Sequence, residues 1–161
     1  MTRPVGLITL LLVALCARAQ QGAAKQEVPD NPAAHPAPQQ PIPFSHKAHI
    51  AQGLACQQCH TNPDPGAQMT LPEVGTCTAC HEAVNQTIPW VRVYQITPGV
   101  TWTHRKHLQA GMQCIMCHGN VAQLDAMAQT TAVLAMASCI NCHQAHNAST
   151  ACATCHAWPR P

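Results

Sequence analysis

Ten cysteines of this chain lie in five copies of one short motif, in which two residues separate a pair of cysteines and a histidine follows directly. The copies are Cys56-Gln-Gln-Cys59-His60, Cys77-Thr-Ala-Cys80-His81, Cys114-Ile-Met-Cys117-His118, Cys139-Ile-Asn-Cys142-His143 and Cys152-Ala-Thr-Cys155-His156. This motif is the attachment signature of c-type haem. The spacing suits the two vinyl groups of a porphyrin, and the adjacent histidine can face the iron as its proximal ligand. The sequence therefore predicts five covalently attached haems c.

Two other uses of cysteine explain the motifs poorly. A disulfide scaffold is common in exported cysteine-rich chains, but it does not require a histidine after every second cysteine. Zinc ribbons combine Cys-x-x-Cys units into sets of four ligands, and five units pair badly. The eleventh cysteine, Cys16, lies in the N-terminal segment, outside the motifs.

The histidines outside the motifs are candidates for the distal iron position. There are six of them: His35, His46, His49, His104, His107 and His146. The first lies in a Pro/Ala-rich stretch and is interpreted as a solvated residue. Four others form two His-x-x-His pairs, and residues i and i+3 of a helix point within about 60° of each other, so one turn can serve two haems. Together with His146, these four histidines give five distal candidates for five irons. This match favours bis-histidine coordination and low reduction potentials.

Methionine is the competing distal ligand, and it would raise the potential of its haem. Met112, Met116, Met127 and Met136 are available. Their spacing fits packing against haem better than iron ligation.

The motifs belong to an internal duplication, which sets the expected architecture. Residues 44–60 (FSHKAHIAQGLACQQCH) align without a gap with residues 102–118 (WTHRKHLQAGMQCIMCH), at an offset of 58. A second motif follows each copy. The repeats therefore span 44–81 and 102–143, and a fifth site at 152–156 is appended.

The run Phe44-Ser-His46-Lys-Ala-His49 ahead of the first motif resembles the start of class III cytochromes c, which are small tri- and tetrahaem periplasmic electron carriers. The resemblance covers about residues 42–158. In that family the first histidine of the pair ligates the haem of the following motif, and the second reaches a haem attached later. The resemblance thus implies His46 for the haem at Cys56 and Cys59. It likewise implies His104 for the haem at Cys114 and Cys117, and it leaves the order of His49, His107 and His146 open.

The second half, from Ile88 to Gly119, also resembles the pentahaem subunit of alternative complex III, a membrane quinol-oxidising assembly. The chain departs from the small carriers in having five sites rather than three or four. It also lacks their lysine-rich docking face, which puts charge-steered partner recognition in doubt.

The composition predicts a fold in which haem replaces side chains as the core. Aromatic residues make up 3% of the chain, and Phe44 and Tyr94 are the only residues of their kinds. Such a chain cannot readily offset roughly 1–2 kcal/mol per residue of backbone entropy by side-chain burial. We therefore expect a multihaem cytochrome c with little regular secondary structure, in which short α-helices and loops wrap a haem core. Short helices are expected from His46, from His104 and over 121–137.

The N-terminus predicts export. Arg3, a short apolar run and Ala17-Arg18-Ala19 form a signal peptide over residues 1–19. The run is shorter than the ~20 residues of a bilayer span, although an uncleaved anchor is an alternative. Residues 20–41 are rich in Pro, Ala and Gln and are predicted to be a disordered tether. Residues 42–161 then form the pentahaem domain, in the periplasm or outside the cell.

Charge and coordination narrow the function. Two of the eight basic residues lie in the signal peptide, so six basic residues face six acidic ones in the mature chain, and no basic patch for nucleic acid remains. No small-molecule substrate is evident. An enzyme needs an open iron position, whereas the available histidines suffice to close every site. We expect an electron carrier with redox partner proteins; an electron-transfer subunit of a membrane quinol-oxidising complex is the alternative, and a multihaem reductase is less favoured.

Overall fold

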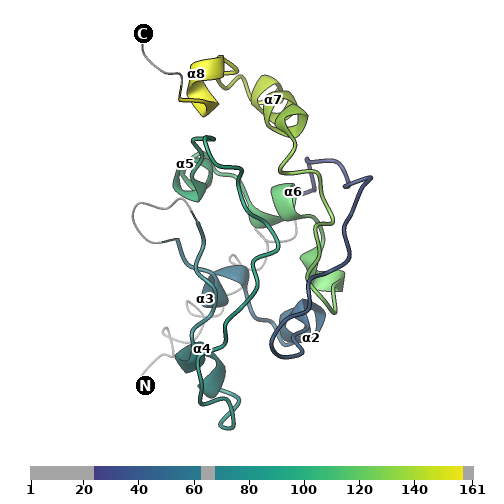
Figure 1. Cartoon of the computed structure of the whole chain (residues 1–161), viewed down its shortest axis with the longest axis vertical. Coiled ribbons are helices and arrows are strands. Elements are labelled where there is room, and N and C mark those ends of the chain that lie inside the picture. Colours follow the sequence, from purple (N-terminus) through teal and green to yellow (C-terminus); the bar gives the residue numbers. More distant parts are fainter. Residues whose placement is uncertain (1–23, 63–67, 158–161) are drawn as a thin grey trace, which may run out of the picture.

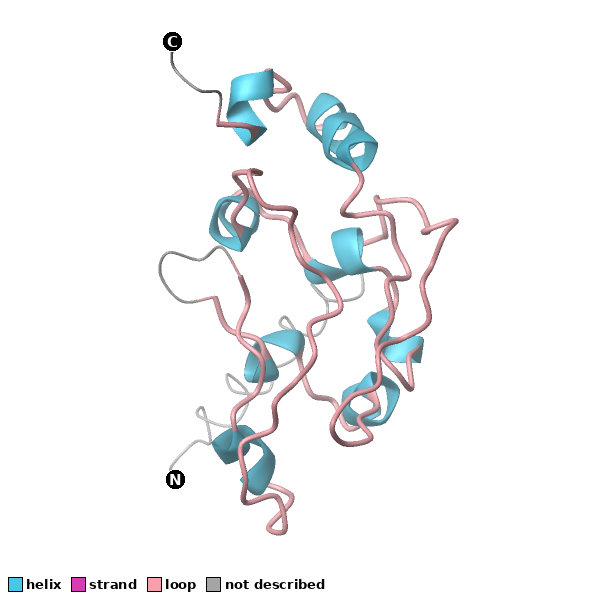
Figure 2. Cartoon of the chain, in the orientation of Figure 1, coloured by secondary structure: helices cyan, strands magenta, loops and turns pink. Residues whose placement is uncertain are grey.

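The computed structural model describes residues 24–62 and 68–157 (Figure 1). Within these ranges the chain forms short helices joined by loops and no β-strand (Figure 2). The helices are α2 (His46–Ala51), α3 (Cys56–Cys59), α4 (Val74–Thr78), α5 (His104–Gln109), α6 (Cys114–His118), the 3₁₀ turn η1 (Val121–Gln123), α7 (Met136–Ala145) and α8 (Cys152–Cys155). The predicted fold of short helices and loops is confirmed. The predicted signal peptide over residues 1–19 lies outside the described residues.

Both His-x-x-His helices begin in the same way, because the repeats supply equivalent caps. The Ser45 hydroxyl accepts a hydrogen bond from the backbone N–H of Ala48 at 3.1 Å, at the start of α2. The Thr103 hydroxyl accepts one from the N–H of Lys106 at 3.2 Å, at the start of α5. Such side-chain caps satisfy helix N–H groups that have no partner within the helix.

The helix predicted over 121–137 is wrong. Only η1 and the start of α7 are helical there, and the residues between them form loops. Thr131, which is 2% exposed, donates its hydroxyl hydrogen bond to the carbonyl oxygen of Cys117 at 2.6 Å. A side-chain hydrogen bond of this kind competes with helical backbone pairing, and the alanine-rich composition concealed it.

The N-terminal strap, residues 26–31, packs against the second repeat, in contrast to the disorder predicted over 20–41. The backbone N–H groups of Glu27 and Val28 both donate to the carbonyl oxygen of Met116 at 3.0 Å. Val28 is only 5% exposed. Backbone hydrogen bonds and one small apolar side chain hold the strap, and composition alone does not reveal such an attachment.

Side chains form almost no core. In the described ranges Val28 is the only buried apolar side chain, whereas Val91, Leu108 and Met136 are 44%, 38% and 64% exposed. Burial of apolar area normally offsets the entropy of ordering the backbone. This chain therefore needs some other apolar group to hold its fold.

The two repeats contact each other through α2 and η1. The backbone N–H of Lys47 donates to the carbonyl oxygen of Leu124 at 3.0 Å. The Asp125 carboxylate accepts a hydrogen bond from Ser45 at 2.9 Å and lies 3.6 Å from the Lys47 ammonium. No helix in the described part of the chain is long and apolar enough to cross a bilayer.

Candidate functional site

Four histidines of the His-x-x-His helices each face a histidine of a cysteine motif. The distances between ring centroids are 6.3 Å for His46 and His60, 6.1 Å for His49 and His81, 6.4 Å for His104 and His118, and 6.1 Å for His107 and His143. The four separations are nearly equal, although the pairs come from different helices and loops. Each repeat is complete in itself, because its two distal candidates pair with its own two motifs.

The separation of the imidazoles suits an iron between them. A bond from an imidazole nitrogen to a metal such as zinc is roughly 2 Å long. Two such bonds leave about 2 Å of each centroid separation, which the distances from ring centre to nitrogen in the two imidazoles fill. Rings in direct contact would lie closer. Two histidine nitrogens fit haem iron, because haem proteins bind the iron through histidine at one or both axial positions.

Backbone carbonyl groups set the tautomer of several of these histidines. The Nδ1 atoms of His49, His60, His107 and His143 lie 2.6–2.9 Å from the carbonyl oxygens of Ser45, Thr70, Thr103 and Ser149, respectively. A carbonyl oxygen can only accept, so Nδ1 carries the proton and Nε2 keeps its lone pair for a metal. Such bonds also fix the orientation of a ligating ring.

Burial lowers the pKa of two of the paired histidines, His46 and His118, and keeps them neutral. Desolvation, with smaller contributions from His104 and His60, lowers the pKa of His118 to about 4. Desolvation, followed by the nearby His60 and His49, also lowers the pKa of His46. A metal ligand must be unprotonated, so these two rings are ready to bind iron at neutral pH.

One aromatic residue in each repeat contacts both distal histidines. Phe44 lies edge-on to His46, with centroids 5.0 Å apart, and stacks on His49 at 4.4 Å. Trp102 is equivalent: it lies edge-on to the first histidine of α5 at 4.2 Å and stacks on the second at 5.1 Å. Each aromatic ring therefore holds the two imidazoles of one His-x-x-His helix in different orientations.

The angle between the two imidazole planes follows the same repeat. It is 18° for His46 and His60, and 55° for His49 and His81. In the second repeat the angles are 13° for the pair that contains His118 and 42° for the pair that contains His143. The first pair of each repeat is thus nearly parallel and the second is tilted.

Nine of the ten motif cysteines lie on helices and Cys80 lies in the turn that follows α4; none of the ten forms a disulfide bond. A hydrogen bond between the side chains of Cys56 and Cys114 lowers the pKa of the first thiol and raises that of the second. Desolvation and the neighbouring Cys142 raise the pKa of Cys117 to about 11. Cysteines of different motifs therefore lie close together.

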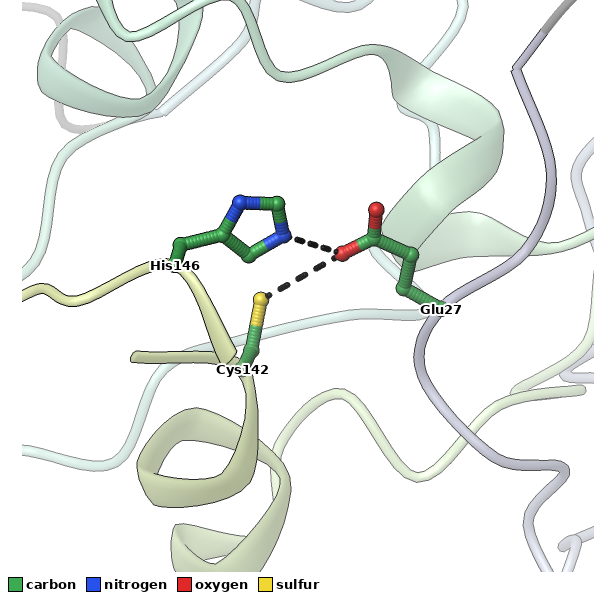
Figure 3. A group of neighbouring side chains, drawn as sticks. All are labelled: Glu27, Cys142 and His146. Carbon is green, nitrogen blue, oxygen red and sulfur yellow. Dashed lines mark hydrogen bonds and ion pairs between the residues drawn. The ribbon is translucent and has the colours of Figure 1, made fainter. Parts of the chain in front are cut away.

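The fifth motif differs from the other four. His156 makes no ring contact with another histidine among the described residues, and its backbone pairs with that of Val100. The predicted distal candidate, His146, directs its Nε2 atom to a carboxylate oxygen of Glu27 at 2.7 Å, and the Cys142 thiol lies 3.7 Å from the same oxygen (Figure 3). The structure does not bring His146 and His156 together.

Sequence reasoning missed the residues that support the imidazoles. Thr70 and Ser149 act through their backbone carbonyl groups, which no side-chain pattern reveals. Glu27 was included in the disordered tether, and nothing in the sequence distinguishes it from the neighbouring acidic residue Asp30.

Comparison with known proteins agrees with this geometry. The model of the class III cytochrome c family matches residues 21–130, which is more than half of the chain, so the chain belongs to the class III cytochrome c family. The protein is therefore a multihaem c-type cytochrome that carries electrons, its cofactor is covalently bound haem c, and its partners are redox proteins. No curated protein matches the chain.

Proposed function

We propose that this protein is a periplasmic electron carrier with five haems c, at least four of which are held between two histidines. The observation that carries the proposal is the set of four imidazole pairs with ring centroids 6.1–6.4 Å apart, each next to a Cys-x-x-Cys turn. Haem c, when bound, supplies the one-electron chemistry, and the chain supplies ligands, spacing and exclusion of water.

Each of the first four motifs has a defined distal ligand in this proposal. The pairs are His60 with His46, His81 with His49, His118 with His104, and His143 with His107. Two strong imidazole donors stabilise the ferric state relative to a His/Met pair, so these haems have low potentials. At these four haems the closed coordination sphere leaves no iron position for a substrate, which favours a carrier over an enzyme.

The proposed fifth haem is bound by Cys152 and Cys155 with His156 as its proximal ligand. The periplasmic location is supported by the signal-peptide pattern over residues 1–19 and by the usual location of class III cytochromes. Attachment of haem c also takes place outside the cytoplasm, where the exported chain is delivered.

The experiment is spectroscopy of the exported, mature protein made in a host with cytochrome c maturation. Near-infrared magnetic circular dichroism of the oxidised form should show bis-histidine haems, at least four per chain. A potentiometric titration should show several one-electron steps at low potential. Fewer than four bis-histidine haems per chain would reject the proposed ligand pairs.

The second candidate is an electron-transfer subunit of a membrane quinol-oxidising complex. It is favoured by the resemblance of the second half, including Trp102, to the pentahaem subunit of such a complex, and by the balanced surface charge. Purification from native membranes distinguishes the two: a free carrier elutes alone, and a subunit elutes with membrane proteins.

A further inference from the structure

The helices α2 and α5 each join two neighbouring haem sites, which are numbered here first to fifth in chain order of their motifs. Helix α2 carries both His46, which faces the first site, and His49, which faces the second. Helix α5 carries His104 for the third site and His107 for the fourth. Two histidines one helical turn apart place their partners on adjacent sides of a six-residue helix. The first and second sites are therefore neighbours, and so are the third and fourth.

The two repeats meet at their first motifs. Helix α2, which supplies the distal histidine of the first site, contacts η1, which directly follows α6 and His118 of the third site. The backbone N–H of Lys47 in α2 donates to the carbonyl oxygen of Leu124, at the end of η1, at 3.0 Å. The thiols of Cys56 and Cys114 also lie close enough to affect each other's pKa. The first site therefore neighbours the third.

The fifth site continues from the fourth. The carbonyl oxygen of Ser149 accepts the hydrogen bond of His143, in the fourth motif, at 2.6 Å. The hydroxyl of the same serine lies 2.7 Å from that of Thr154, inside the fifth motif. Cys139 and Cys155 are also close enough to interact electrostatically. The fourth and fifth sites are thus neighbours.

The overall arrangement of the helices agrees with this order. Along the long axis of the molecule, Figure 1 shows α4 at the lower end, followed by α3, α6, α7 and α8 at the upper end. These are the helical turns of the second, first, third, fourth and fifth motifs. A thioether sulfur is bonded directly to a carbon at the haem edge, so cysteines in contact set two macrocycle edges side by side.

We propose, on the basis of the five haems proposed above, that the haems stand in single file in the order second, first, third, fourth, fifth. The second haem, at Cys77 and Cys80, and the fifth, at Cys152 and Cys155, are the two ends. One redox protein donates its electron at one end and another accepts it at the opposite end, with no net change in the carrier. The path therefore does not follow the order of attachment along the chain.

The test is two-dimensional NMR of the fully reduced holoprotein, in which low-spin haems are diamagnetic. Nuclear Overhauser effects between the thioether protons and meso protons of different haems report which macrocycle edges touch. We expect cross-peaks between the haems of the first and second, first and third, third and fourth, and fourth and fifth sites. The cross-peak between the haems at Cys56 and Cys114 is the decisive one.

Cross-peaks between the second and third haems, with none between the first and third, would overturn the order and restore a path that follows the chain. A branched pattern, in which the second haem contacts more than one other, would also overturn it. Haem stoichiometry and ligation are measured beforehand on the same sample, so a failure of the proposed function is recognised separately from a wrong order.

Discussion

The substitution His49→Ala removes one distal histidine and leaves every attachment cysteine in place. The His49 imidazole lies 6.1 Å from that of His81, so its loss leaves the iron of the second haem with one protein ligand. We expect five haems to remain attached, one haem in five to become high-spin in the oxidised protein, and the reduced protein to bind one more carbon monoxide per chain than wild type. Electron paramagnetic resonance and carbon monoxide titration measure these changes.

The same substitution should also lower stability by an amount that the contacts allow us to estimate. The ring stacks on Phe44 at 4.4 Å, and such aromatic contacts contribute about 0.5–1.5 kcal/mol. Its Nδ1–H donates to the Ser45 carbonyl at 2.8 Å, which contributes about 0.5–1.5 kcal/mol more. The free energy of unfolding should fall by about 1–3 kcal/mol, before any loss of the iron bond.

The matched control is His35→Ala, since His35 is exposed and lies outside both repeats. It should leave the spin state, carbon monoxide stoichiometry and stability unchanged. If His49→Ala and the control behave alike in the carbon monoxide titration, His49 is not an iron ligand, and the reasoning from imidazole separations is refuted.

Three further substitutions test other parts of the structure. Trp102→Leu should alter the electron paramagnetic resonance signals of the third and fourth haems and leave those of the first two unchanged; equal changes in both repeats would contradict the positioning role. Gly119→Ala should destabilise the protein by about 1–3 kcal/mol in thermal or denaturant unfolding, because its φ of 68° and ψ of –163° suit glycine alone and a Cβ atom would lie 3.0 Å from the methyl group of the buried Thr131. His146→Ala should leave the number of low-spin haems unchanged, because Glu27 occupies its Nε2 atom; a new high-spin haem would instead establish His146 as the distal ligand that the sequence predicted.

The sequence predicted the parts of this protein that depend on local pattern. The run Phe44-Ser-His46-Lys-Ala-His49 ahead of the first Cys-x-x-Cys-His motif resembles class III cytochromes c, and the family match agrees. The scarcity of aromatic residues predicted short helices and loops around haem, and the described residues do form short helices and loops. The aromatic and hydroxyl residues ahead of each His-x-x-His pair belong to the repeat, and Ser45 and Thr103 cap the helices as such residues usually do.

The remaining features depend on contacts between distant parts of the chain. The strap around Val28 is held mainly by backbone hydrogen bonds to Met116, which any residue could make. The contact between Cys56 and Cys114 depends on how the two repeats are docked, and a repeat pattern does not define that arrangement. For the same reason the partner of His146 could be found only in three dimensions.

The mass of the mature, exported protein tests the central claim most directly. We expect the mass of the chain after removal of residues 1–19 plus five haems. Each haem should stay attached under denaturing conditions, because ten thioether bonds hold the five groups. A mature protein that carries no covalent haem, or a number other than five, would contradict it.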